Sequence, residues 1–88
     1  MPDLNVATRI LVVDDSSVDR QLVSGLLGAQ PDFDVDMAES SRAAMAKLQS
    51  GRFDLVVTDL QMPDIDGLQL VKSLSDEFPD LPSILVTA

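Results

Sequence analysis

Residues 9–15 read RILVVDD, an apolar run that ends in two adjacent carboxylates. Ile10 through Val13 show no alternation between apolar and polar side chains, which is typical of a strand covered on both faces in a parallel sheet. Asp14 and Asp15 end the run abruptly. The stretch therefore predicts a buried parallel strand with acidic groups at its carboxyl end.

Helical and strand patterns alternate along the rest of the chain. Apolar residues recur at helical spacing in three segments: residues 18–27, 44–48 and 68–78. Three further segments have strand patterns: residues 33–37, 54–58 and 83–87. The first of these alternates apolar and acidic residues and predicts a strand near a sheet edge with one wet face, whereas the other two are continuous apolar runs. The order β-α-β-α-β-α-β predicts an α/β fold, with a parallel sheet covered by helices on both faces.

Serines and a glycine mark the predicted helix ends. Ser16 or Ser17 is placed to cap the first helix, and Ser40 or Ser41 to cap the second. Gly51 follows the second helix, where a glycine often ends one.

Composition limits the classes of function. The chain has 88 residues, which allows one small domain, and 45% of them are hydrophobic, as in globular proteins. A net charge of −9 disfavours binding of nucleic acid or an anionic membrane. With no Cys and no His, the chain has neither disulfides nor the commonest general base. No segment is a membrane span or signal peptide, so we expect a cytoplasmic location.

Side chains with oxygen atoms follow three of the predicted strands. Asp14 and Asp15 follow the first strand, Asp59 follows the third, and Thr87 ends the fourth. Ligands of open α/β sheets bind at the carboxyl ends of the strands, so the three carboxylates converge if the first and third strands are neighbours. Such a cluster suits a hard cation such as Mg²⁺, and a carboxylate can also be a nucleophile that forms an aspartyl phosphate. A single Asp at a strand end is more often a turn former or helix cap, but the combination favours a site.

Other acidic motifs have weaker functional interpretations. Asp34 and Asp36 alternate with apolar residues along a predicted strand. We interpret them as the solvated face of that strand rather than as a cation site. Asp64 and Asp66 are spaced like the nucleophile pair of haloacid-dehalogenase-type phosphatases. They do not follow a buried strand, and we interpret them as a loop and helix-capping element. The chain has no glycine-rich phosphate-binding loop.

Four separated stretches resemble the receiver domain of two-component response regulators. They occur at predicted strand ends and in the family's order: residues 10–15, 54–63, 66–67 and 85–88. Arg20, in the first predicted helix, also matches the pattern of this family. The resemblance implies a flavodoxin-like, doubly wound parallel sheet with strand order 2-1-3-4-5. It makes residues 9–88 the receiver domain and residues 1–8 a lead-in.

The resemblance also implies a role for each site residue. Asp59 would be the phosphoacceptor, and its phosphoryl donor would be a sensor histidine kinase or a phosphotransfer protein. Asp15 would bind Mg²⁺ directly, Asp14 mainly through water, and Gln61 through its backbone carbonyl, and Asp59 would be a further metal ligand. Thr87 would be the switch hydroxyl. Self-phosphorylation and autodephosphorylation with Mg²⁺ are expected of the intact domain only, and no activity on an external substrate is expected.

Family members continue through a further helix, strand and helix, which carry a Lys and an aromatic switch residue. We expect this chain to lack that last helix-strand-helix portion. Phosphorylation would then be impaired, because the Lys that neutralises the phosphoryl oxygens would be missing. The fourth strand would be an exposed apolar edge, and apolar faces of the first helix and the sheet would lose their cover. These features predict a homodimer or strand-swapped oligomer. The alternative function is a receiver-like interaction module without phosphotransfer.

Overall fold

The computed structural model describes residues 7–59 and 67–86, in which strands and helices alternate in the predicted order. The elements are β1 (Thr8–Val13), α1 (Ser17–Gly28), β2 (Phe33–Ala38), α2 (Ser41–Ser50), β3 (Leu55–Asp59), α3 (Gly67–Glu77) and β4 (Ser83–Val86). Strand bounds differ from the predicted ones by one residue at several ends. Thr8, for example, belongs to β1, because its N–H donates to the carbonyl of Asp32 in the turn before β2.

All strands of the described sheet are parallel, in the order β2-β1-β3-β4. This order agrees with the family's order over the strands that are present. The acidic alternating strand β2 lies at one edge, as its sequence pattern predicted. β1 and β3 are neighbours in the interior, with Val13 beside Thr58, so the condition for convergence of the three carboxylates is met.

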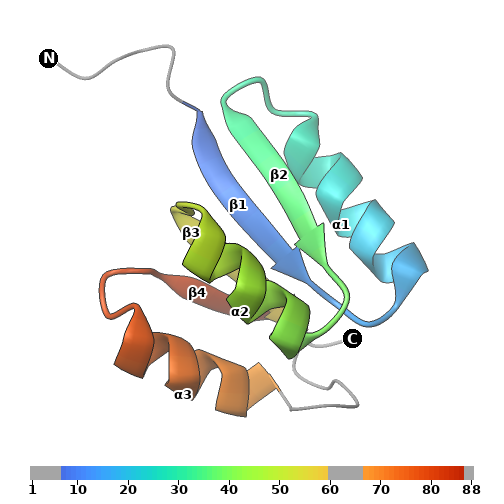
Figure 1. The fold of residues 1–88 in the computed structure, drawn as a ribbon. Helices are drawn as coiled ribbons and strands as arrows, with labels where there is room; N and C mark the ends of the chain where they lie inside the picture. The colour runs from blue at the N-terminus through green and yellow to red at the C-terminus, as the bar shows by residue number, and fades with distance from the viewer. Residues whose placement is uncertain (1–6, 60–66, 87–88) are drawn as a thin grey trace, which may run out of the picture.

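Both faces of the sheet are covered by helices, α1 on one face and α2 with α3 on the other (Figure 1). Successive side chains of a strand point to opposite faces. Leu11 and Val13 therefore pack in the core under α2 and α3, whereas Ile10 and Val12 pack in the core under α1. This two-sided burial explains why β1 has no polar alternation.

The first serine of each pair caps its helix. Ser16 is the N-cap of α1 and accepts from the N–H of Asp19, and Ser40 is the N-cap of α2 and accepts from the N–H of Ala43. Gly51 is the C-cap of α2, but its backbone is extended, with φ −150°. Its place at the helix end is confirmed, although no left-handed conformation requires glycine there.

Some apolar surface in the described part of the chain is uncovered. Val18, Leu22 and Leu26 on α1 are 72%, 60% and 68% exposed, and Ile84 on β4 is 50% exposed. The other apolar stripe of α1, with Val23 and Leu27, packs against the sheet. The prediction of uncovered apolar faces on the first helix and the sheet is thus confirmed for these residues.

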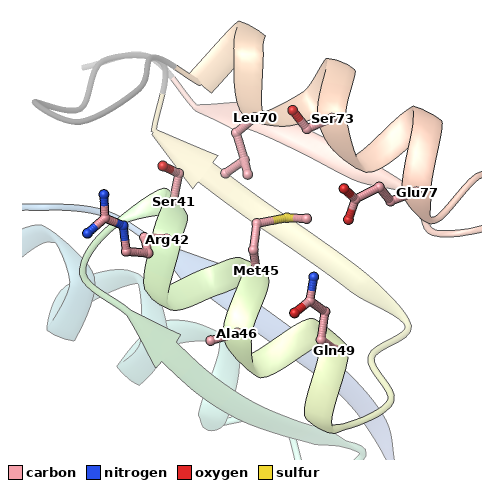
Figure 2. A pocket seen from close by; sticks show the side chains of 8 residues that line it. All are labelled: Ser41, Arg42, Met45, Ala46, Gln49, Leu70, Ser73 and Glu77. Carbon is pink, nitrogen blue, oxygen red and sulfur yellow. The ribbon is translucent and has the colours of Figure 1, made fainter.

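A groove of about 590 Å³ lies between α2 and α3 (Figure 2). Its lining residues are Ser41, Arg42, Met45, Ala46, Gln49, Leu70, Ser73 and Glu77. None of the three clustered carboxylates lines it, so the groove is separate from the candidate site. None of the described helices combines the length and the apolar character needed to cross a membrane.

Candidate functional site

The candidate site is a cluster of carboxylates at the carboxyl ends of β1 and β3. Asp14 and Asp15 follow β1 directly, and Asp59 is the last residue of β3. One carboxylate oxygen from each residue can be chosen so that all three oxygens lie within 4.8 Å of one another. The structure therefore brings together the three carboxylates that the sequence predicted would converge.

Hydrogen bonds hold Asp14 at three of its atoms. Its N–H donates to the carbonyl of Ala38 over 3.1 Å, which completes the pairing of β1 with β2 at its carboxyl end. Its Oδ1 accepts from the N–H of Ser16 over 2.9 Å, and its carbonyl accepts from Nη1 of Arg20 over 2.7 Å. Asp14 is only 9% exposed, whereas the neighbouring Asp15 is exposed. The turn thus presents one buried, anchored carboxylate and one exposed carboxylate.

Asp59 reaches the cluster from the interior strand β3 and is half-buried. The backbone of β3 is paired on both sides, with β1 and with β4, where Asp59 lies beside Val86. Its predecessor Thr58 is fully buried and donates from Oγ1 to the carbonyl of Asp59 over 3.2 Å. A nucleophile at this position would be held on a rigid element while its carboxylate remains partly accessible.

Burial and neighbouring negative charge raise the pKa of Asp14 above its ordinary value. Burial is the largest cause, and repulsion from Asp59, Asp19 and Asp15 acts in the same direction. The hydrogen bond from the Ser16 N–H opposes the shift by stabilising the charged carboxylate. The cluster is therefore electrostatically unfavourable by itself and suited to a cation.

The donor set fits Mg²⁺ rather than a softer metal. Carboxylate oxygens are the ligands of hard cations, and Mg²⁺ characteristically takes one or two carboxylates while it retains several waters. Asp14, Asp15 and Asp59 could supply these carboxylate ligands from one side of the ion. Asp15 is exposed, so the site is open to solvent. The remaining coordination positions could then be taken by water or by an oxygen of a phosphoryl group.

Two predicted site residues, Gln61 and Thr87, lie outside the described residues, as do Asp64 and Asp66. Their predicted roles stay predictions.

The alternating aspartates of β2 are paired with basic side chains. Asp34 lies 3.5 Å from Arg9, and Asp36 lies 2.8 Å from Lys47. Among the described residues, neither belongs to a group of acidic side chains that could hold a metal ion. These contacts support the interpretation of β2 as a solvated strand face.

Sequence reasoning gave Arg20 no role in the site. Its position one turn into α1, five residues after Asp15, is the only signal in the sequence. The bond from its guanidinium to a backbone carbonyl depends on the geometry of the turn, which a pattern of residue types does not specify.

Fold and site together define a receiver domain, and comparison with known proteins agrees. The chain matches the family described as response regulator receiver domain over residues 10–88, and it belongs to that family. Receiver domains are signalling switches that bind Mg²⁺ at an acidic pocket, and here the carboxylate cluster occupies the corresponding place.

Relatives of several kinds share this domain. The chain is 45% identical over 78 residues to a protein-glutamate methylesterase/protein-glutamine glutaminase of Nocardioides sp., with 88% of the chain aligned to 21% of that protein. It is 37% identical over 87 residues to the chemotaxis protein CheY-3 of Vibrio cholerae, with 97% of the chain aligned to 67% of that protein.

A solved structure is similar throughout the fold. The response regulator protein TrrA from Thermotoga maritima, in complex with Mg(2+)-BeF, superposes with a TM-score of 0.87 and 38% identity. The match covers 92% of this chain and 70% of that one.

Proposed function

We propose that the chain is a phosphoacceptor receiver domain, in which Asp59 takes a phosphoryl group from a histidine kinase or a phosphotransfer protein. The observation that carries the proposal is the convergence of Asp14, Asp15 and Asp59 within 4.8 Å. Residues 9–88 form the receiver unit after a lead-in of residues 1–8, and the expected location is the cytoplasm.

Asp59 has two tasks in this proposal, as the nucleophile and as one of the metal ligands. A carboxylate oxygen of Asp59 attacks the phosphorus atom, a new O–P bond forms, and the P–N bond to the donor imidazole breaks with its electron pair on nitrogen. Asp14 and Asp15, together with Asp59, would hold Mg²⁺, which would supply the positive charge that offsets repulsion between the carboxylates and the phosphoryl oxygens. As the resemblance implies, the backbone carbonyl of Gln61 would be a further Mg²⁺ ligand, and the hydroxyl of Thr87 would be the switch hydroxyl.

The surface next to the site supports docking of a protein donor. Val18 and Leu22 are 72% and 60% exposed on the first turns of α1, directly after the acidic turn. Exposed apolar side chains in a row are typical of protein contact surfaces. A donor that covers them would lie next to the turn that carries Asp14 and Asp15.

The decisive experiment incubates the protein with Mg²⁺ and acetyl phosphate and measures the intact mass. We expect a Mg²⁺-dependent phosphoryl adduct that is lost in Asp59→Asn. Asp54→Asn is the matched control, because Asp54 lies at the opposite end of β3 and should leave the adduct intact. Absence of an adduct from both this chain and a longer form with the further helix-strand-helix portion would overturn the proposal.

The alternative functions predict other results in the same assay. An interaction module without phosphotransfer forms no adduct but still binds a partner through its exposed apolar surface. A phosphatase that uses an aspartate nucleophile turns over an external phosphoester with Mg²⁺. The intact carboxylate cluster favours the phosphoacceptor over the interaction module.

The proposal includes self-association of the 88-residue chain as a homodimer or strand-swapped oligomer through β4. Ile84, 50% exposed on the edge strand of the described sheet, is the observation that supports it.

A further inference from the structure

Arg20 contacts the acidic turn from the first turn of α1. Its Nη1 donates to the carbonyl oxygen of Asp14 over 2.7 Å, and its backbone N–H donates to the carbonyl of Ser16 over 2.9 Å. The side chain is half-buried. A guanidinium donor at this distance makes a charge-assisted hydrogen bond, which is stronger than a bond between neutral groups. Arg20 is thereby joined to the turn by both its backbone and its side chain.

The carbonyl that Arg20 holds belongs to the peptide unit between the two consecutive candidate ligands. A peptide unit is planar, so the position of the Asp14 oxygen determines the orientation of the plane that leads to Asp15. Asp15 is exposed, and side-chain packing therefore does little to place its carboxylate. The orientation of the peptide plane instead sets the direction in which the Asp15 side chain leaves the backbone.

We propose that Arg20 is a positioning residue for the metal site: its bond to the Asp14 carbonyl orients the Asp14–Asp15 peptide so that both carboxylates face the same cation as Asp59. The inference rests on the proposed Mg²⁺ site. It adds a residue that contacts neither the metal nor the phosphoryl group and acts through the backbone of the ligands.

Charge and positioning predict opposite effects when Arg20 is replaced by a neutral residue. Removal of a nearby positive charge makes the cluster more negative, which by itself strengthens Mg²⁺ binding. Loss of the carbonyl bond lets the peptide reorient, which weakens binding. Residues that orient metal ligands characteristically change affinity by about 10–100-fold. The sign of the change thus distinguishes the two effects.

The test is a Mg²⁺ titration by isothermal calorimetry, without a phosphodonor, of the wild type and three variants. We expect Arg20→Met to bind Mg²⁺ about tenfold more weakly, and Arg20→Lys, which keeps the charge and one donor, to recover part of that loss. Arg52→Met is the matched control, because it removes the same charge from an exposed residue before β3, at the opposite end of the sheet. We expect its affinity to be unchanged or slightly higher.

Amide hydrogen exchange measured without Mg²⁺ gives a second readout. The Ser16 N–H, which is bonded to Oδ1 of Asp14, should exchange faster in Arg20→Met than in the wild type, while amides of β3 remain protected. Circular dichroism checks that the variants fold. If Arg20→Met does not fold, Arg20→Lys decides, since weaker binding by a folded Arg20→Lys supports the inference.

Equal or tighter Mg²⁺ binding by folded Arg20 variants, unchanged exchange at Ser16, or a wild type that does not bind Mg²⁺ would each overturn the inference. A wild type that binds Mg²⁺ in this titration, combined with the absence of an acetyl phosphate adduct from both this chain and the longer form, would instead overturn the proposed phosphoacceptor function alone.

Discussion

Asp14 combines burial with negative neighbours, and these raise the pKa of its carboxyl group in the folded state. A raised pKa means that the fold favours the protonated form, so this contribution to stability is fully present below the ordinary value of 3.8 and is lost as the pH rises through the folded-state value. At pH 7 the charged Asp14 therefore destabilises the metal-free protein. Such a cost is typical of functional sites, where stability and activity compete.

We therefore expect Asp14→Asn to raise the melting temperature at pH 7 in the presence of EDTA. The Asn side chain can keep an oxygen that accepts from the Ser16 N–H, so the change removes charge and retains the bond. Thermal unfolding at pH 7 and near pH 3 checks this, and the gain should shrink at the lower pH. Asp32→Asn, in the exposed turn before β2, is the control. A lower melting temperature for Asp14→Asn at pH 7 would contradict the explanation.

At the residue scale, the sequence predicted the chemistry of the site but not how the site is held. Carboxylates that end two apolar strands can be recognised from residue types alone, and Asp14, Asp15 and Asp59 do converge. The bond from Arg20 to a carbonyl depends on a rotamer and a turn conformation. Neither has a periodic signature in the sequence.

At the scale of elements, Lys47 connects α2 to β2. Its Nζ donates to Oδ1 of Asp36 over 2.8 Å and to the carbonyl of Met37 over 2.6 Å. The hydrogen bond from Lys47 is the main cause that lowers the pKa of Asp36. A lowered pKa stabilises the fold above the ordinary value of 3.8, and this stabilisation is lost as the pH falls through the folded-state value.

Lys47→Met should lower the free energy of unfolding at pH 7 by about 0.5–1 kcal/mol, because both partners of the pair are partly exposed and water weakens their attraction. Urea unfolding at pH 7 and near pH 3 measures the change. The deficit should shrink as the pH falls, because protonation of the Asp36 carboxylate removes the ion pair. Lys72→Met, which removes an exposed lysine of α3, is the control. A deficit that grows on acidification would show that the ion pair is not its source.

The order and type of the elements followed from the sequence, but the orientation of α1 did not. The sequence predicted apolar residues at helical spacing and an apolar face that loses its cover, but not which residues form that face. In the structure, Val23 and Leu27 pack against the sheet, whereas Val18, Leu22 and Leu26 are exposed. Helical periodicity reports that apolar stripes exist, and only the position of the sheet determines which of them is buried.

At the scale of the whole molecule, the two edges of the described sheet differ in chemistry. β2 carries Asp34 and Asp36, and charged side chains on an edge strand oppose pairing with another sheet. β4 carries Ile84, which lies beside Val57 of β3 and so shares the face on which α1 packs, mainly over β1 and β2 (Figure 1). An apolar edge without charged residues is a template for pairing with another copy.

Self-association through β4 should therefore depend on Ile84. We expect the 88-residue chain to give a mass in light scattering that rises with concentration, and Ile84→Lys to remain a monomer, because a charge on this strand opposes edge-to-edge pairing. Leu26→Lys is the matched control, since it adds the same charge to a side chain that is 68% exposed on α1, away from β4. If Leu26→Lys abolishes association and Ile84→Lys does not, the contact runs through the helix stripe. A wild-type chain that unfolds cooperatively as a monomer at every concentration rules out association through either surface.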